Sequence, residues 1–188
     1  MKLLFSATSL GNAFNELTTS ARGYVPSQLR SGELAVGMTP LMNAAIRFTS
    51  QLVIELLEYA PPKGYVQDLE SVLIAKLATW IDEGAMSLRT HDMICVIGEL
   101  TRAAHNYAHP NAASVKHVME TLPRSLTIAA VTFTIQLALE ETELPAVVLR
   151  GLESELIRKL EAPWEFGELP LSVDVQDGPT WGSPSPRR

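Results

Sequence analysis

The chain has 188 residues, of which 46% are hydrophobic, 19% charged and 6% aromatic, and its formal net charge is -6. A chain of this length buries roughly 70% of the surface that it exposes when unfolded, so one domain needs neither disulfides nor a structural metal. The single cysteine, Cys95, excludes an intramolecular disulfide and paired-cysteine zinc sites. The apolar runs are much shorter than the roughly 18 residues that cross a bilayer, so we expect no membrane insertion.

The first segment, residues 1–37, is predicted to be an N-terminal arm. Residues 1–32 hold three basic residues, one acidic residue and eight serines or threonines. A basic, hydroxyl-rich and acid-poor start is typical of a mitochondrial transit segment. The second interpretation is an ordinary amphipathic helix of the folded protein, because four apolar residues recur at helical spacing: Phe5, Leu10, Phe14 and Leu17. We expect a mitochondrial location, or otherwise a cytoplasmic one.

From Thr39 onward apolar residues recur every three or four positions, which predicts an all-α domain over residues 38–160. Thr39 and Pro40 are expected to open the first helix, because threonine caps an orphan amide and proline has no amide to leave unpaired. Prolines and glycine at 61–64 end it. A second helix is expected over residues 65–82. The predicted core faces of the two helices are Leu41, Ala45, Phe48, Leu52 and Leu56, and Leu69, Val72, Leu73, Leu77 and Trp80.

Four further helices are predicted after Gly84. The third opens at Ser87 and Leu88, and the fourth is short and ends at Pro123. The fifth spans about 125–141, where a β-branched run locally favours a strand but the length favours a helix. Pro145 opens the sixth. The predicted core residues are Met93, Val96, Ile97, Leu100 and Tyr107, then Val115, Val118, Met119 and Leu122, then Ile128, Val131, Ile135 and Ala138, and finally Leu149, Leu152, Leu156 and Leu160.

These helices form three successive hairpins. The pairs Ser87-Leu88 and Ser125-Leu126 open equivalent helices 38 residues apart. Two-helix units at such a period are typical of α-solenoids, in which each hairpin stacks on its neighbours. The sequence therefore predicts helical-hairpin repeats, arranged as a short α-solenoid or as a right-handed helical bundle.

The segments 88–100 and 126–138 resemble the first helices of organellar helical-hairpin repeats, namely the octotricopeptide and FAST-kinase-like proteins. The resemblance covers about residues 38–160. It implies an α-solenoid that acts in mitochondrial or plastid RNA processing or ribosome biogenesis. The chain departs from these families because it is short, has no nuclease-like C-terminal domain and has an acidic body.

The residues that most often carry catalysis give little indication of an enzyme. His105 and His109 have metal-ligand spacing and His117 follows, but Pro110 interrupts the helix and no glutamate lies between the pair as in H-E-x-x-H. We expect these histidines and His91 to be solvated. Cys95 is predicted to be a buried structural thiol. The acidic pairs Asp82-Glu83 and Glu140-Glu141 are expected to be solvated helix ends. No phosphate-binding glycine loop or nucleophile elbow is present, and no catalytic residue, metal or cofactor is predicted.

A few arginines are candidate RNA contacts. Phosphate binding needs clustered basic residues, whereas acids are interleaved with the arginines here. We therefore expect protein partners first, RNA as an alternative and no DNA. The candidate RNA contacts are Arg89, Arg102, Arg124, Arg187 and Arg188.

The last segment, residues 161–188, is predicted to be an extended tail, because Pro, Gly and Ser punctuate it. Large apolar side chains along an acidic extended segment are typical of docking into a partner's groove. Trp164 and Phe166 are expected to fold back on the last helix pair, and residues 171–181 to dock. The candidate partner-binding residues are Trp164, Phe166, Leu171, Val173 and Trp181.

The sequence therefore predicts an all-α, non-catalytic scaffold or adaptor subunit of a large organellar ribonucleoprotein assembly, such as a mitochondrial ribosome or an RNA-processing complex. One alternative is a self-assembling viral or phage structural protein. A second is a metal-dependent helical hydrolase that uses His105 and His109.

Overall fold

The structure is a computed structural model that describes residues 3–4, 9–24, 31–57, 61–82, 90–110, 115–162 and 164–165. It confirms the all-α class. The helices are α1 (Ser9–Gly23), α2 (Ser31–Leu56), α3 (Lys63–Asp82), α4 (His91–Ala108), α5 (Val115–Glu141) and α6 (Ala146–Glu161). A two-residue parallel pair, β1 (Leu3–Leu4) with β2 (Trp164–Glu165), joins the two ends of the described chain.

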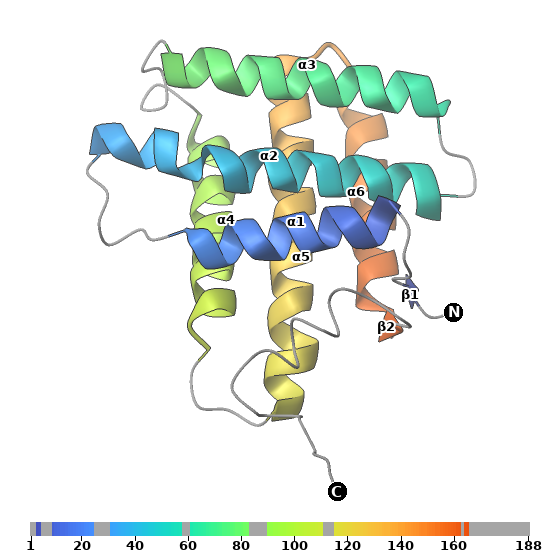
Figure 1. Ribbon diagram of the computed structural model, residues 1–188. Coiled ribbons are helices and arrows are strands. Elements are labelled where there is room, and N and C mark those ends of the chain that lie inside the picture. The colour runs from blue at the N-terminus through green and yellow to red at the C-terminus, as the bar shows by residue number, and fades with distance from the viewer. Residues whose placement is uncertain are drawn as a thin grey trace, which may run out of the picture.

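The helices form two layers that cross each other (Figure 1). In one layer α1 packs on α2 and α2 on α3, and in the other α4 packs on α5 and α5 on α6. Across the layers α2 contacts α5 and α1 contacts α4. In a solenoid each hairpin contacts only its sequence neighbours, whereas here helices from opposite ends of the chain share one core.

Helix α5 is the centre of this core. Nearly every position from Leu126 to Ala138 is buried, so the helix is covered on almost all sides. Thr127, Thr134 and Gln136 are buried with the apolar residues, and both threonines donate to carbonyls of their own helix. The helix prediction for the β-branched run 127–135 is confirmed, because packing on both layers outweighs the modest local preference for strand.

The predicted break at Pro123 is wrong. Residues 115–141 form one helix with Pro123 inside it, where two helices ending and starting around 123 were expected. A proline removes one backbone hydrogen bond, and packing against neighbouring helices offsets that loss. The second and third predicted hairpins consequently share a helix.

The predicted start of the helix expected from Thr39, which corresponds to α2, is also wrong. Helix α2 begins at Ser31, so Thr39 and Pro40 lie within it and do not cap it. The start of α4 also differs from the prediction, because Thr90 caps the helix and His91 is its first residue. Ser87 and Leu88 lie outside the described residues.

The prediction that residues 1–37 form an extended arm does not hold over Ser9–Gly23, which forms helix α1. Leu10, Phe14 and Leu17 are buried in the common core, and the rings of Phe14 and Phe48 pack with their centroids 5.9 Å apart. Arg22 donates to the hydroxyl of Tyr107 at 3.2 Å and lies over its ring, which ties α1 to α4. The amphipathic-helix interpretation therefore describes this part of the chain.

Candidate protein-binding surface

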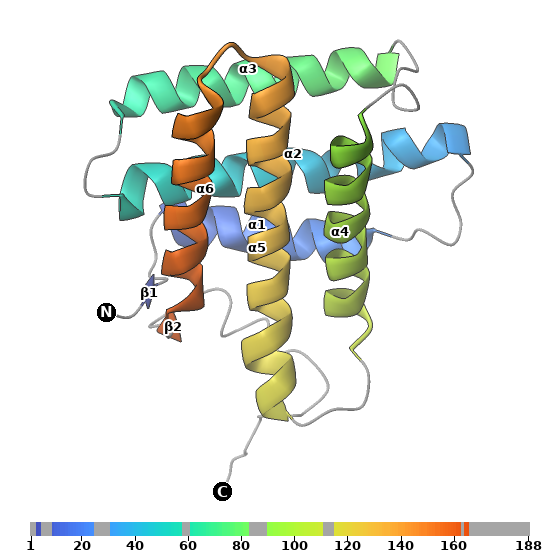
Figure 2. The same cartoon turned by 180° about the vertical axis from the view of Figure 1, so that it is seen from behind.

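Among the described residues, the large apolar side chains that stay exposed belong to helices that meet at one end of the molecule. Two belong to α3, and the others belong to the first turns of α4 and α6. Figures 1 and 2 show that α4 and α6 both begin at the end where α3 crosses the second layer. We call this set the apolar end; its residues are Tyr65, Val72, Ile94, Val147 and Val148.

The first turn of α6 carries the most exposed members of the apolar end. Val147 is 80% exposed and Val148 is 56% exposed. Leu149, Leu156 and Leu160 are buried and fix the orientation of the helix. Because successive residues are rotated by about 100°, the two valines before Leu149 face away from the core. Two adjacent valines in water are unfavourable unless another surface covers them.

The start of α4 is held by a helix cap that also contacts α5. Thr90 Oγ1 accepts from the amide of Met93 at 3.1 Å and donates to Glu140 Oε2 at 2.5 Å. An N-cap of this kind is worth about 1 kcal/mol. Since Met93 is buried and Ile94 follows it, the cap fixes an exposed isoleucine in place at the apolar end.

The ends of α3 and α5 are joined in the same region. Trp80 Nε1 donates to Glu141 Oε1 at 2.6 Å, and the Trp80 ring is buried. Glu140 and Glu141 were expected to be solvated, but both are half-buried and hydrogen-bonded between helices. Their role is structural, because each links α5 to a neighbouring element.

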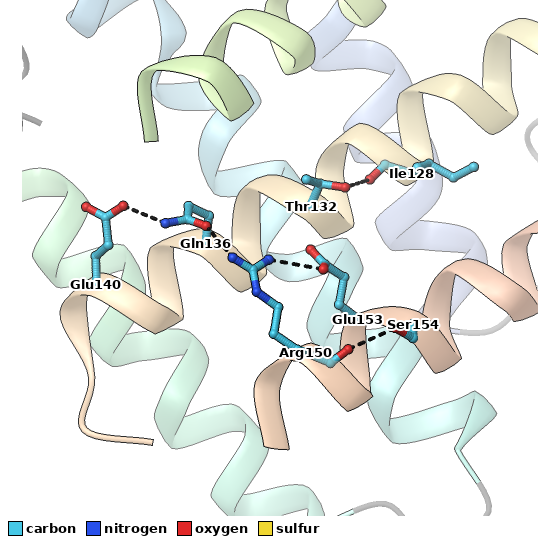
Figure 3. A network of polar contacts seen from close by, with 7 residues as sticks. All are labelled: Ile128, Thr132, Gln136, Glu140, Arg150, Glu153 and Ser154. Carbon is cyan, nitrogen blue, oxygen red and sulfur yellow. Dashed lines mark hydrogen bonds and ion pairs between the residues drawn. The ribbon is translucent and has the colours of Figure 1, made fainter. Parts of the chain in front are cut away.

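A polar network continues from α5 to α6 (Figure 3). Gln136 Nε2 donates to Glu140 Oε2 at 2.7 Å, and Arg150 donates to Gln136 Oε1 at 3.0 Å and to Glu153 Oε1 at 3.1 Å. Glu153 Oε2 is buried with no hydrogen-bond partner among the described residues. The network fixes the first two turns of α6 against α5. Thr132 and Ser154, beside it, donate to carbonyls of their own helices.

Three charged residues meet where α1, α2 and α3 lie side by side. Arg47 of α2 pairs with Glu16 of α1 at 2.5 Å. On α3, burial raises the pKa of Glu70, while a hydrogen bond from Ser50 and the charge of Arg47 oppose that rise and Glu16 adds to it. The residues lie far apart in sequence and no local motif marks them, so the sequence did not point to this cluster. One arginine between two carboxylates is a typical structural ion-pair group.

Two of the arginines proposed for RNA contact, Arg102 and Arg124, lie within the described residues. Arg124 is half-buried and donates to the backbone oxygens of Leu160 at 3.1 Å and Ala162 at 3.4 Å. It therefore satisfies carbonyls at the end of α6, which gives it a structural role, and its RNA contact stays a prediction. Arg102 is exposed on α4. Arg89, Arg187 and Arg188 lie outside the described residues.

The predicted docking tail falls almost wholly outside the described residues. The backbone of Trp164 pairs with Leu3 in the parallel β1–β2 ladder, so the chain turns back toward the N-terminal segment at this point. Phe166, Leu171, Val173 and Trp181 lie beyond the described part of the chain, and their role as partner contacts stays a prediction.

The histidines show no complete metal site within the described residues. The rings of His105 and His109 are 5.0 Å apart and both residues are exposed, while the side chain of His117 is outside the described part. The described side chains include no group of three His, Cys, Asp or Glu residues placed to hold a metal.

The predicted burial of Cys95 is wrong. The thiol is exposed and lies 3.5 Å from His91 Nε2, one turn earlier. Cys95 follows the buried Met93 by two positions, which is about 200° around the helix and therefore on the opposite face. Ile94 beside it is exposed as well, so the apolar residues next to Cys95 in sequence do not bury it.

One segment, Thr121–Glu141 of α5, has the length and apolar composition of a membrane-crossing helix. Two thirds of its most apolar window is buried inside the protein, as is usual for the central helix of a helical core. Comparison of the chain with protein-family models, curated proteins and solved structures gives no match.

Proposed function

We propose that the chain is a non-catalytic adaptor subunit that binds other protein subunits of a larger assembly. The observation that carries this proposal is the apolar end, where five large apolar side chains are exposed on three helices of a well-packed core. Protein interfaces are built around such side chains, because burying them on a partner provides most of the binding energy.

The polar side chains of the described residues support an adaptor over an enzyme. Arg124 binds helix-end carbonyls, Arg150 links α5 to α6, and Trp80 and Glu141 join α3 to α5. These contacts tie α5 to α3 and to α6, and α2 and α4 also pack on α5. A rigid body with a fixed apolar surface loses little conformational entropy when it binds.

An organellar ribonucleoprotein, either a mitochondrial ribosome or an RNA-processing complex, is the assembly that we propose. The basic, hydroxyl-rich start of the chain and the resemblance of its hairpins to organellar repeats support this assignment. Because α1 contributes Leu10, Phe14 and Leu17 to the core, a removable transit segment would have to end before Ser9. RNA is the alternative partner, with Arg102 as an exposed candidate contact.

The test is affinity purification of the tagged protein from its native cells in mild detergent, followed by mass spectrometry and sizing, with and without ribonuclease. We expect a large particle that contains other subunits and survives ribonuclease. The double variant Ile94→Lys/Val147→Lys should lose those subunits. The control Asn106→Lys adds a lysine at an exposed position of α4 outside the apolar end and should keep them. Recovery of the wild-type protein alone would contradict the adaptor function.

A further inference from the structure

Helix α3 has an outer face that no described element covers. It is the edge helix of its layer and packs on α2 and α5 through Val66, Leu73, Leu77 and Trp80. The opposite side of the helix is exposed along its whole length. We call this side the outer α3 face; its residues are Tyr65, Asp68, Ser71, Val72, Ala75, Lys76 and Thr79.

The outer α3 face is mostly apolar, small or hydroxyl-bearing, with only two charged residues, Asp68 and Lys76. A solvent-facing helix surface normally carries more charge. Val72 lies in the middle and is 45% exposed, and Tyr65 is 47% exposed. Ser71, Ala75 and Thr79 are small, so they allow another helix to approach the backbone closely.

The charges are placed symmetrically about Val72. Asp68 is four residues before it and Lys76 four residues after it, and Tyr65 and Thr79 are seven before and seven after. At about 100° per residue, positions four and seven away lie within roughly 40° of Val72 around the helix. All five side chains therefore share one exposed stripe.

We propose that the outer α3 face binds the same face of a second copy of this chain, antiparallel, across a twofold axis at Val72. In that arrangement the two Val72 side chains meet on the axis. Asp68 of each copy lies opposite Lys76 of the other, which makes two equivalent ion pairs. A twofold interface of this kind is self-complementary, because residue i contacts j while j contacts i.

The charge pattern selects a second copy in this one orientation. A parallel pairing would put Asp68 beside Asp68 and Lys76 beside Lys76, which is repulsive. Within one chain the two residues are eight positions apart, so they form no ion pair along their own helix, where only residues three or four apart are neighbours. Helix α3 has 20 residues and is about 30 Å long, which is enough to hold both pairs and the apolar centre.

The self-association goes beyond the adaptor function, although the two surfaces share Tyr65 and Val72 of α3. The other three residues of the apolar end, on the first turns of α4 and α6, are not part of the outer α3 face and stay available to other proteins. A failure of self-association would leave the affinity purification from cells unaffected. Conversely, the purified chain can dimerise even if no other subunit binds it.

The first test is the oligomeric state of the purified full chain, measured by sedimentation equilibrium over a concentration series. We expect a dimer that does not grow into larger species, because a twofold contact closes on itself. Asp68→Lys and Lys76→Asp each bring like charges together and should weaken the dimer about tenfold or more. The double variant Asp68→Lys/Lys76→Asp restores opposite charges and should return the dissociation constant to within a few fold of wild type.

The second test is cross-linking in a Cys95→Ser background, which removes the native exposed thiol. Val72→Cys should form an intermolecular disulfide quickly, because the two introduced thiols would meet on the axis. Gln67→Cys is the matched control, since Gln67 is exposed on α3 but lies about 140° away from Val72. A wild-type protein that is monomeric at about 100 µM would overturn the proposal. A dimer whose dissociation constant does not change with the charge reversals would also overturn it, as would equally fast cross-linking at positions 67 and 72. Circular dichroism confirms that each variant is folded.

Discussion

The hydroxyl oxygens of Thr49 and Thr134 lie 3.2 Å apart, both buried, where α2 crosses α5. Thr49 Oγ1 also donates to the carbonyl of Ala45 at 2.9 Å and lies 3.4 Å from the carbonyl of Ala130. Small side chains and hydroxyls that bond to their own helix let the two backbones come close without leaving polar atoms unpaired. This crossing joins the two layers into one core.

A larger side chain at this crossing should destabilise the protein. Ala130 is fully buried, so Ala130→Leu has to push α2 away from α5 and should lower the free energy of unfolding by about 1–3 kcal/mol. Urea unfolding followed by circular dichroism measures it. The matched change Ala78→Leu, on an exposed position of α3, should alter stability by less than about 0.5 kcal/mol. Equal effects of the two substitutions would mean that the layers do not meet at Ala130.

The contribution of α1 to the core makes a second prediction. Phe14 is fully buried against Phe48, so Phe14→Ala should lower the free energy of unfolding by about 3–5 kcal/mol. The exposed neighbour Asn12 serves as the control, and Asn12→Ala should change it by less than about 0.5 kcal/mol. If Phe14→Ala is as stable as the control, residues 9–23 are a dispensable arm after all.

The periodic pattern predicted the helices and most core faces correctly. In α2, for example, Leu41, Phe48 and Leu52 recur on one stripe and are fully buried. Such spacing predicts which side of a helix is buried in the core, because burial of the apolar side stabilises the fold. It carries no information about which other helix covers that side, so the crossing of α2 over α5 could not be predicted.

Local signals failed where tertiary packing decides the outcome. Pro40 and Pro123 lie inside α2 and α5, because contacts with neighbouring helices offset one missing hydrogen bond. Cys95 is exposed because its position around the helix, and not its apolar neighbours in sequence, fixes its environment. Arg124 binds Leu160, which is 36 residues away, so no short motif marks it.

The structural role assigned to Arg124 has a measurable consequence. Arg124→Ala removes the hydrogen bonds that Arg124 donates to the carbonyls of Leu160 and Ala162 and should lower the free energy of unfolding by about 1–2 kcal/mol. Arg124→Lys keeps the charge but loses the forked donor geometry, so it should recover only part of the stability. Arg102→Ala removes an exposed arginine and should have little effect on unfolding. An Arg124→Ala protein of wild-type stability with weakened RNA binding would support the RNA contact instead.

The raised pKa of Glu70 predicts a pH dependence of stability. Burial disfavours its charged form, so the folded state binds this proton more tightly than the unfolded state does. Stability from this group is therefore present at low pH and is lost as the pH rises through the folded pKa, above the ordinary value of 4.5. Glu70→Gln should be more stable than wild type at pH 7, and the difference should disappear below the ordinary pKa.

The control for Glu70 is an exposed glutamate on the neighbouring helix, Glu55. Urea unfolding between pH 3.5 and 8 compares Glu70→Gln, Glu55→Gln and wild type. The other charged groups at this site are Arg47 and Glu16, and both stay unchanged in the comparison. A Glu70→Gln protein less stable than wild type at pH 7 would mean that the Ser50 hydrogen bond and the attraction to the Arg47 charge outweigh burial.

Photo-cross-linking in native cells tests the adaptor function most directly. A photoreactive amino acid placed at Val147, in the apolar end, should cross-link to one or a few other subunits, while the same probe at the exposed Asn106 should not. Ribonuclease treatment should leave the products from position 147 unchanged. An absence of protein cross-links at 147, or the same products from both positions, would contradict the claim that the apolar end binds protein subunits.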